Sequence, residues 1–353
     1  MIEKQLQQKE NKATTFNLAL SPLRIVFMGT PEFAVASLDA LVKAGYNIVG
    51  VITAPDKPAG RGMQVQQSAV KKYAAEHNLN VLQPEKLKGP EFLEALKALK
   101  ADLQIVVAFR MLPEVVWNMP PMGSVNLHGS LLPQYRGAAP INWAVINGEK
   151  ETGVTTFKLK QEIDTGDILL QQSFPIGEND TAGDVHDAMK AIGAQVLVKT
   201  VQGLAAGTLK EVPQSLFVSG EPTGVSNISP AFTTHDSPLT SHDLPKHAPK
   251  IFTETCRIDF TKTVDEVHNL IRGLSPFPGA FTMLNGKTLK IYKSEKVFKD
   301  IQSVSNSPEA DYVTDAKTFL HFACADGYIA VKELQLEGKK KMNVEDFLRG
   351  YRF

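Results

Sequence analysis

Two polar side chains stand two residues apart where the apolar segment SVNL ends. They are Asn126 and His128. Within a strand, residues i and i+2 point to the same face, so we expect the amide and the imidazole to lie side by side. The amide offers two N–H donors, and a protonated imidazole adds another. Together they can stabilise a developing oxyanion, which predicts a site for nucleophilic attack on a carbonyl group.

A carboxylate would help to keep His128 protonated, because a nearby negative charge favours the charged form of an imidazole. Asp164, in the segment EIDTGDIL, is the candidate. Each of the three residues also has an ordinary structural interpretation. Asn126 can cap a turn, His128 can bind a backbone carbonyl, and Asp164 can form an Asx turn. For any one of them in isolation, the structural interpretation is the commoner one.

The elements that must position these residues alternate between strands and helices. Apolar segments predict strands at 23–29, 46–53, 103–109, 124–127 and 153–159. Helical patterns lie between several of them, and the longest covers 181–207. This alternation favours a Rossmann-like, doubly wound and mostly parallel sheet. Ligands in such α/β sheets bind beyond the carboxyl ends of the strands, which is where Asn126 and His128 lie.

The chain changes character after this region. Residues 213–250 are rich in Ser, Thr, Pro and Gly without a hydrophobic period, which predicts a linker. Beyond it, alternating segments and the Asn285-Gly286 hairpin signal predict a small OB-like β-barrel. We therefore predict a polar N-terminal extension at 1–22, a catalytic domain at 23–212, the linker, and a C-terminal domain at 251–353.

Composition excludes some classes of protein and leaves others open. Lys+Arg and Asp+Glu number 38 each, so overall charge gives no argument for nucleic-acid binding. We expect no membrane span and no secretory signal, because no apolar run is long enough for either. Cys256 and Cys324 lack the spacing of a metal site. We therefore expect a cytoplasmic protein with reduced thiols and no catalytic metal.

Local basic segments are candidates for nucleic-acid contacts, although each can also be plain solvated surface. The candidates are Lys57 and Arg61 in PDKPAGRG, Lys287, and Lys339, Lys340 and Lys341 in EGKKKMN. The segment GTPEFAV has only one of the three glycines that a dinucleotide-binding loop requires. We interpret it as a simple strand-to-helix turn.

The longer patterns HGSLLPQYRGAAPINW and IDTGDIL together resemble the formyltransferase family that uses 10-formyltetrahydrofolate as co-substrate. The resemblance implies transfer of a formyl group to an amine, with Asn126, His128 and Asp164 at the catalytic positions. In VVAFRMLP, Arg110 stands where Gly is commoner in the family. The folate contacts that the resemblance implies are Ser130, Leu131, Leu132 and Pro133, together with Phe109, Met111 and Leu112.

The segments GTPEFA and PDKPAGRG and the C-terminal domain resemble those family members that formylate methionine on initiator tRNA for translation initiation. The resemblance implies initiator methionyl-tRNA as partner, contacts to it from the basic segments, and a monomer. Two activities of the same family stay open: formylation of a sugar-nucleotide amine, and hydrolysis of formyltetrahydrofolate. A non-enzymatic folate- or RNA-binding protein is a further alternative, which the complete Asn–His–Asp set disfavours. Because the three catalytic candidates precede residue 165, we expect the C-terminal domain to hold the large substrate.

Overall fold

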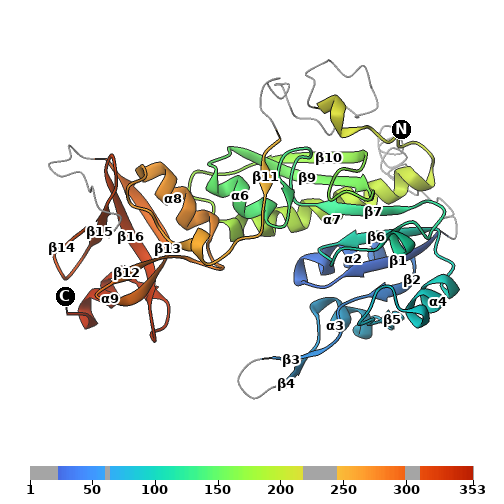
Figure 1. The fold of residues 1–353 in the computed structure, drawn as a ribbon, viewed down its shortest axis with the longest axis horizontal. Helices are drawn as coiled ribbons and strands as arrows, with labels where there is room; N and C mark the ends of the chain where they lie inside the picture. Colours follow the sequence, from blue (N-terminus) through green and yellow to red (C-terminus); the bar gives the residue numbers. More distant parts are fainter. Residues whose placement is uncertain (1–22, 60–63, 218–244, 299–310, 353) are drawn as a thin grey trace, which may run out of the picture. The chain divides into compact units, whose positions relative to one another are not determined.

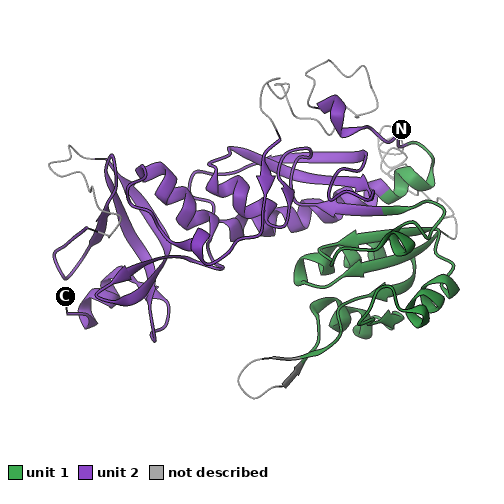
Figure 2. Ribbon diagram, viewed as in Figure 1, with its two compact units in different colours: residues 1–124, 201–208 green, residues 125–200, 209–353 purple. Residues whose placement is uncertain are grey.

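The computed structural model describes residues 23–59, 64–217, 245–298 and 311–352 (Figure 1). The predicted N-terminal extension, Arg61 and most of the predicted linker lie outside these ranges. The chain forms two compact units: residues 1–124 with 201–208, and residues 125–200 with 209–353 (Figure 2). These units divide the chain differently from the domains predicted at 23–212 and 251–353, which stay a prediction.

The first unit contains a parallel sheet in the order β6-β1-β2-β5. Strand β1 forms because its apolar residues 25–28 are completely buried between its neighbours. The strands are β1 (Arg24–Gly29), β2 (Asn47–Ile52), β5 (Val81–Leu82) and β6 (Leu103–Val107). The helices are α2 (Glu32–Lys43), α3 (Ala69–Glu76), α4 (Pro90–Ala98) and α5 (Glu114–Trp117). This alternation of strands and helices confirms the predicted α/β class.

Two short strands flank the end of the basic segment PDKPAGRG in this unit. Strands β3 (Lys57–Ala59) and β4 (Gln64–Gln66) pair antiparallel, with residues 60–63 between them. Lys57 is exposed at the first position of the hairpin. The basic segment PDKPAGRG, residues 55–62, therefore includes the paired strand β3.

The second unit begins with three antiparallel strands in the order β10-β9-β7. They are β7 (Ser124–His128), β9 (Glu151–Lys158) and β10 (Ile168–Pro175). The helices are α6 (Pro140–Ile146) and α7 (Ala182–Ala205). Two short strands, β8 (Arg136–Gly137) and β11 (His247–Ala248), pair in parallel. The paired residues Arg136 and His247 are 111 positions apart in the chain (247 − 136). Strand β11 belongs to the predicted linker, so the end of that segment is ordered.

The C-terminal part of the second unit is a six-stranded antiparallel sheet, which confirms the predicted smaller β domain. Its strands are β12 (Ala280–Leu284), β13 (Lys287–Val297), β14 (Tyr312–Thr314), β15 (Leu320–Ala323), β16 (Tyr328–Leu336) and β17 (Met342–Asn343). The hairpin signal is confirmed: Asn285 and Gly286 have φ of 47° and 77°, as a type I′ turn requires. Helices α8 (Val264–Gly273) and α9 (Val344–Gly350) contribute buried side chains to its core.

Helix α8 packs against helix α6 of the same unit. The side chain of Asn142 donates to the carbonyl of Gly273 at 2.7 Å. Only glycine fits at position 273, because an added Cβ would lie 2.5 Å from the Ile146 side chain. The guanidinium of Arg272 donates to the carbonyl of Asp180 at 3.0 Å. Cys256 and Cys324 are free and buried in this part of the chain.

Candidate active site

Strand β7 brings Asn126 and His128 to the same face. They pair with Phe157 and Thr155 of strand β9, while Val125 and Leu127 are buried on the other face. His128 is 6% exposed. Asn126 is half-buried, and its side chain makes no hydrogen bond with the part of the chain that the structure describes. The amide is therefore available to an added ligand, as the alternation of the strand predicts.

The two ring nitrogens of His128 face different groups. Nε2 lies 2.9 Å from the carbonyl oxygen of Tyr135. Because a carbonyl can only accept, Nε2 must carry a hydrogen. Nδ1 lies 3.7 Å from Oδ2 of Asp164, and the edge of the imidazole packs against the ring of Phe157. At 3.7 Å these two atoms lie beyond hydrogen-bond distance, so the carboxylate does not occupy Nδ1.

Asp164 is held from two sides. Its Oδ2 accepts the backbone N–H of Gly137 at 2.9 Å. Its backbone carbonyl accepts the side-chain amide of Gln214 at 2.8 Å. The residue has φ of 54°, in the left-handed region that a residue with a Cβ rarely occupies without local support. These contacts aim the carboxylate at His128.

Sequence reasoning missed the residues that surround the pair. Tyr135 is buried, and its hydroxyl donates to Glu149 and accepts from the amide of Asn147 at 3.0 Å. Burial and the bond to Glu149 raise the pKa of Tyr135 far above its ordinary value, so the phenol stays neutral. Lys246 pairs with Glu149 at 2.6 Å. No local pattern could have found these residues, because the side-chain bonds among them join positions 12 to 97 residues apart in the chain.

The turn Ser130–Pro133 is packed inward. Ser130 and Leu132 are buried, and the hydroxyl of Thr155 joins them by donating to the Ser130 carbonyl at 2.6 Å and accepting the Leu132 N–H at 3.1 Å. Leu132 packs in a small apolar cluster with Phe157 and Ile168. Pro133 is buried, whereas Leu131 is half-buried. The side chains of this turn serve the fold, and their contact with folate stays a prediction.

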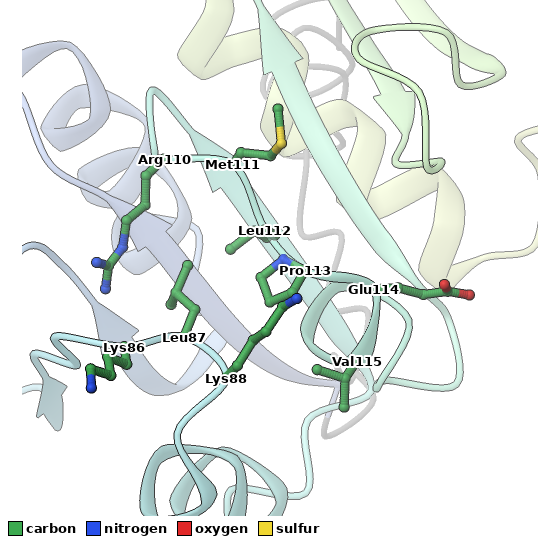
Figure 3. A pocket seen from close by; sticks show the side chains of 9 residues that line it. All are labelled: Lys86, Leu87, Lys88, Arg110, Met111, Leu112, Pro113, Glu114 and Val115. Carbon is green, nitrogen blue, oxygen red and sulfur yellow. The ribbon is translucent and has the colours of Figure 1, made fainter.

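The other predicted folate segment, residues 109–112, borders a pocket of the first unit (Figure 3). Met111 is 72% exposed, Leu112 is half-buried, and Phe109 lies under the guanidinium of Arg110 at 5.6 Å from its ring centroid. The pocket has a volume of about 1020 Å³ and is lined by Lys86, Leu87, Lys88 and residues 110–115. Three cations and several apolar side chains suit a flat ligand that carries a negative charge. Residues 109–112 belong to the first unit, and residues 130–133 belong to the second.

The lysines predicted to contact nucleic acid gather at one end of the C-terminal sheet. Lys287 follows the β12–β13 turn, and the N–H of Glu337 bonds the carbonyl of Thr288 at 2.8 Å, which brings the β16–β17 turn beside it. Lys287 and the three lysines of that turn are all exposed. Lys341 pairs with Glu333 at 2.6 Å, whereas Lys339 and Lys340 have exposed side chains without such a pair among the described residues. Arg61 lies outside the described residues.

Metal-ligand clusters and membrane-spanning helices are both absent from the described residues. Within them, no group of three or more His, Cys, Asp or Glu could hold a metal ion. No helix in the described part of the chain is both long and apolar enough to cross a membrane.

Comparisons with known proteins identify relatives along nearly the whole chain. The family model described as formyl transferase matches residues 23–201, and the model of the formyl transferase C-terminal domain matches residues 250–352. A methionyl-tRNA formyltransferase of Bacteroides fragilis is 51% identical over 335 residues, covering 93% of this chain and 95% of the relative. One of Parabacteroides distasonis is 52% identical over 336 residues, covering 94% of this chain and 96% of the relative.

Solved structures share the fold at lower identity. A sugar 3N-formyl transferase crystallised with dTDP and 5-N-formyl-THF has a TM-score of 0.61 and 22% identity, covering 91% of this chain and all (100%) of that one. HypX of Aquifex aeolicus in complex with tetrahydrofolic acid has a TM-score of 0.58 and 17% identity, covering 94% of this chain and 48% of that one. At these identities the likeness concerns the fold alone.

Proposed function

The chain belongs to the formyl transferase family, and on that premise we propose that it acts as a methionyl-tRNA formyltransferase. It transfers the formyl group of 10-formyltetrahydrofolate to the α-amino group of methionine on initiator methionyl-tRNA. The observation that carries the proposal is the pairing of His128 with Asp164 beside the unengaged amide of Asn126. Curated relatives with this activity in their names are 51% identical to the chain.

The proposed mechanism uses the two sides of His128. The neutral amine of methionine attacks the formyl carbon, and the formyl oxygen becomes an oxyanion. The amide of Asn126 and the Nδ1–H of protonated His128 donate to that oxyanion. The carboxylate of Asp164, 3.7 Å from Nδ1, stabilises the imidazolium without consuming its hydrogen. No covalent enzyme intermediate is needed, because the amine is itself a competent nucleophile.

One proton must pass from the attacking amine to the leaving group. We propose that Asp164 accepts it from the amine through a water, since the contacts with Gly137 and His128 engage only Oδ2. Asp164 then returns this proton through water to the nitrogen of the folate leaving group, so that tetrahydrofolate departs neutral at that atom. Asp164 thus acts first as the electrostatic partner of His128 and then as a proton acceptor.

We propose Phe109, Met111 and Leu112 as folate contacts of the first unit, and we propose Ser130–Pro133 as folate contacts of the second. In the pocket beside Met111, apolar side chains offer contact to a flat ring. Lys86, Lys88 and Arg110 lie on its walls and complement the carboxylates of the folate glutamate. Arg110 is also anchored, because it donates to the carbonyl of Glu85 at 2.9 Å.

For the tRNA, we propose two contact regions. The basic segment PDKPAGRG, which contains Lys57 and Arg61, would meet the acceptor end, where an arginine can bind phosphate or stack on a base. Lys287 and Lys339–Lys341 would bind phosphates farther along the molecule. Net charge is zero for the whole chain, so this contact depends on local clusters. We further propose that the protein is cytoplasmic and monomeric. Sedimentation of the purified protein would test the monomeric state.

The decisive experiment compares formyl acceptors. Purified protein is supplied with 10-formyltetrahydrofolate and either methionyl initiator tRNA, a dTDP-amino sugar, or water alone. We expect formyl-methionyl-tRNA as the main product. Faster formylation of the sugar nucleotide would replace the proposal with the sugar activity, and release of formate without an acceptor would replace it with hydrolysis. Absence of all three would leave a binding protein.

A further inference from the structure

The structure describes both ends of the segment between the two predicted domains. One end contacts the loop of Asp164, and the other contacts residues 134–139, which in turn contact His128 and Asp164. One end is Gln214, in the short helix η1 (Gln214–Phe217). The other is residues 245–249, which contain strand β11. The sequence predicted only a linker here. The contacts of Gln214 and residues 245–249 give this segment a more specific role.

Gln214 bridges two loops through a side chain that is only 4% exposed. Its Oε1 accepts from Nε and Nη2 of Arg136 at 3.0 and 2.6 Å. Its Nε2 donates to the carbonyls of Asp164 and Gly166 at 2.8 Å each. A guanidinium cannot accept and a carbonyl cannot donate, so only one orientation of the amide satisfies all four bonds. Gln214 thereby holds Asp164 in its left-handed conformation.

Strand β11 supports strand β8, whose Gly137 binds the Asp164 carboxylate. The carbonyl of Ala248 accepts the N–H of Ala138 at 2.7 Å. Strand β8 comes so close that a Cβ at Gly137 would lie 2.5 Å from that carbonyl, and Gly137 has φ of 126°. Glycine is required here for both reasons. Because β8 pairs closely with β11, the N–H of Gly137 is directed at Oδ2 of Asp164.

Residues 246–248 also position the Tyr135 carbonyl, which binds His128. The N–H of Tyr135 donates to the carbonyl of Lys246 at 2.7 Å, and the ammonium of Lys246 pairs with Glu149, which also accepts the Tyr135 hydroxyl. Tyr135 has φ of 59°, so its backbone needs this support. Its carbonyl then places a hydrogen on Nε2 of His128 and leaves Nδ1 to face Asp164.

From these contacts we infer that Gln214 and residues 246–248 are positioning residues for formyl transfer. They set the distance between Nδ1 of His128 and the Asp164 carboxylate without touching a substrate. The inference rests on the proposed function, because it assigns their effect to the proposed catalytic pair. It makes the connection between the domains a part of the active-site scaffold.

The variant Gln214→Met tests the inference, because methionine has nearly the same length but cannot hydrogen-bond. We expect kcat to fall by about 100-fold, the cost of misplacing a reacting group by roughly 1 Å. The KM for folate should change little, and the shape of the pH profile of kcat should change. The imidazole NMR signals of His128 should also shift, while those of His186 on helix α7 stay as an internal reference.

The matched control is Gln104→Met, which removes an equally buried amide from strand β6. Gln104 is 1% exposed and accepts from the hydroxyl of Ser124 at 2.9 Å. This variant should lose a similar amount of stability and keep kcat. If Gln214→Met keeps kcat and leaves the His128 signals unchanged, the inference is overturned.

A second variant covers the case in which Gln214→Met does not fold. Lys246→Met removes the half-exposed ammonium that pairs with Glu149 and leaves the backbone of β11 intact. We expect kcat to fall by about 10-fold with unchanged folate KM. Unchanged kcat and unchanged His128 signals in this folded variant would also overturn the inference. The NMR signals report on positioning even if the wild-type protein formylates no tRNA, so the two failures are distinguishable.

Discussion

At the residue scale, the two ring nitrogens of His128 face different groups, a backbone carbonyl and the proposed catalytic carboxylate. Nε2 is bound by the carbonyl of Tyr135 at 2.9 Å, while Nδ1 faces Asp164 at 3.7 Å. An imidazole with both nitrogens tightly bonded could not assist an oxyanion. In the proposed mechanism, Asp164 stabilises the imidazolium from 3.7 Å and leaves the Nδ1–H to the oxyanion.

Replacing Asp164 by Asn tests this division. The variant keeps the shape of the side chain and removes the negative charge that favours the imidazolium. We expect kcat to fall by at least about 100-fold, the scale of losing a general acid–base partner. Folate binding, measured by fluorescence titration, should change little. Near-normal turnover would remove Asp164 from the mechanism.

A second residue-scale prediction concerns His268, which is buried where α8 packs on β13. Its Nδ1 lies 3.0 Å from the Ser294 hydroxyl. Burial, and then the charges of Arg272 and Lys296, lower the pKa of His268, although Asp265 and the backbone of Glu178 oppose them. The folded protein therefore resists protonation that the unfolded chain accepts. The free energy of unfolding should fall as pH drops below about 6.5, the ordinary value.

The variant His268→Asn keeps a polar partner for Ser294 and removes the titrating ring. Urea unfolding between about pH 7 and pH 5 should show a weaker loss of stability in this variant than in the wild type. His186→Asn, at a partly exposed position, is the control and should keep the wild-type slope. Equal slopes in all three proteins would show that His268 does not cause the pH dependence.

At the element scale, the hairpin β3–β4 carries the basic segment that we assign to the acceptor end of the tRNA. Arg61→Ala should lower kcat/KM for methionyl-tRNA by about 10-fold or more, because the substitution removes a charge-assisted bond to phosphate or base. The KM for folate should stay constant. Lys97→Ala removes one positive charge from the exposed face of helix α4 in the same unit and should have no such effect. Equal kinetics of both variants would withdraw the assignment of Arg61.

The turn between β16 and β17 is the second element with a predicted role in RNA binding. Lys339 and Lys340 are exposed there, whereas Lys341 pairs with Glu333 and lies 4.9 Å from the ring centroid of Tyr292. The double variant Lys339→Ala/Lys340→Ala should weaken tRNA binding and lower its salt dependence, by about one unit of log K per log salt for each lysine that binds a phosphate. The measurement is tRNA binding from about 50 to 200 mM salt. An unchanged slope would place these lysines outside the RNA interface.

At the scale of the whole molecule, folate binding should stabilise the native protein. A ligand that binds only the folded state raises its free energy of unfolding, by about 2.7 kcal/mol at 100 times Kd. We expect 10-formyltetrahydrofolate, or its stable 5-formyl isomer, to raise the melting temperature, and NAD(H) to leave it unchanged. A shift with NAD(H) alone would restore the dinucleotide interpretation of the GTPEFAV turn.

The contacts of Gln214 and of β11 change what a truncation can reveal. The sequence predicts that the domain after residue 250 holds the large substrate and is not needed for the chemistry, because the three catalytic candidates precede residue 165. A chain that ends near residue 212 would lack both Gln214 and residues 246–248, which hold the loops of Asp164 and Tyr135. Its loss of formylation could not be ascribed to tRNA binding alone. Point variants in the full chain are therefore the sharper experiments.

What the sequence determined by itself is the set of features that depend on neighbours in the chain. The two-residue period of a strand predicts that Asn126 and His128 share a face, and the steric freedom of Asn-Gly predicts the hairpin at 285–286. Only the tertiary structure decided how the pair is completed. Gln214 reaches Arg136, 78 positions away, and the Tyr135 carbonyl selects the hydrogen-bearing nitrogen of His128. Such contacts depend on how loops from distant segments pack, and no local pattern of residue types specifies that packing.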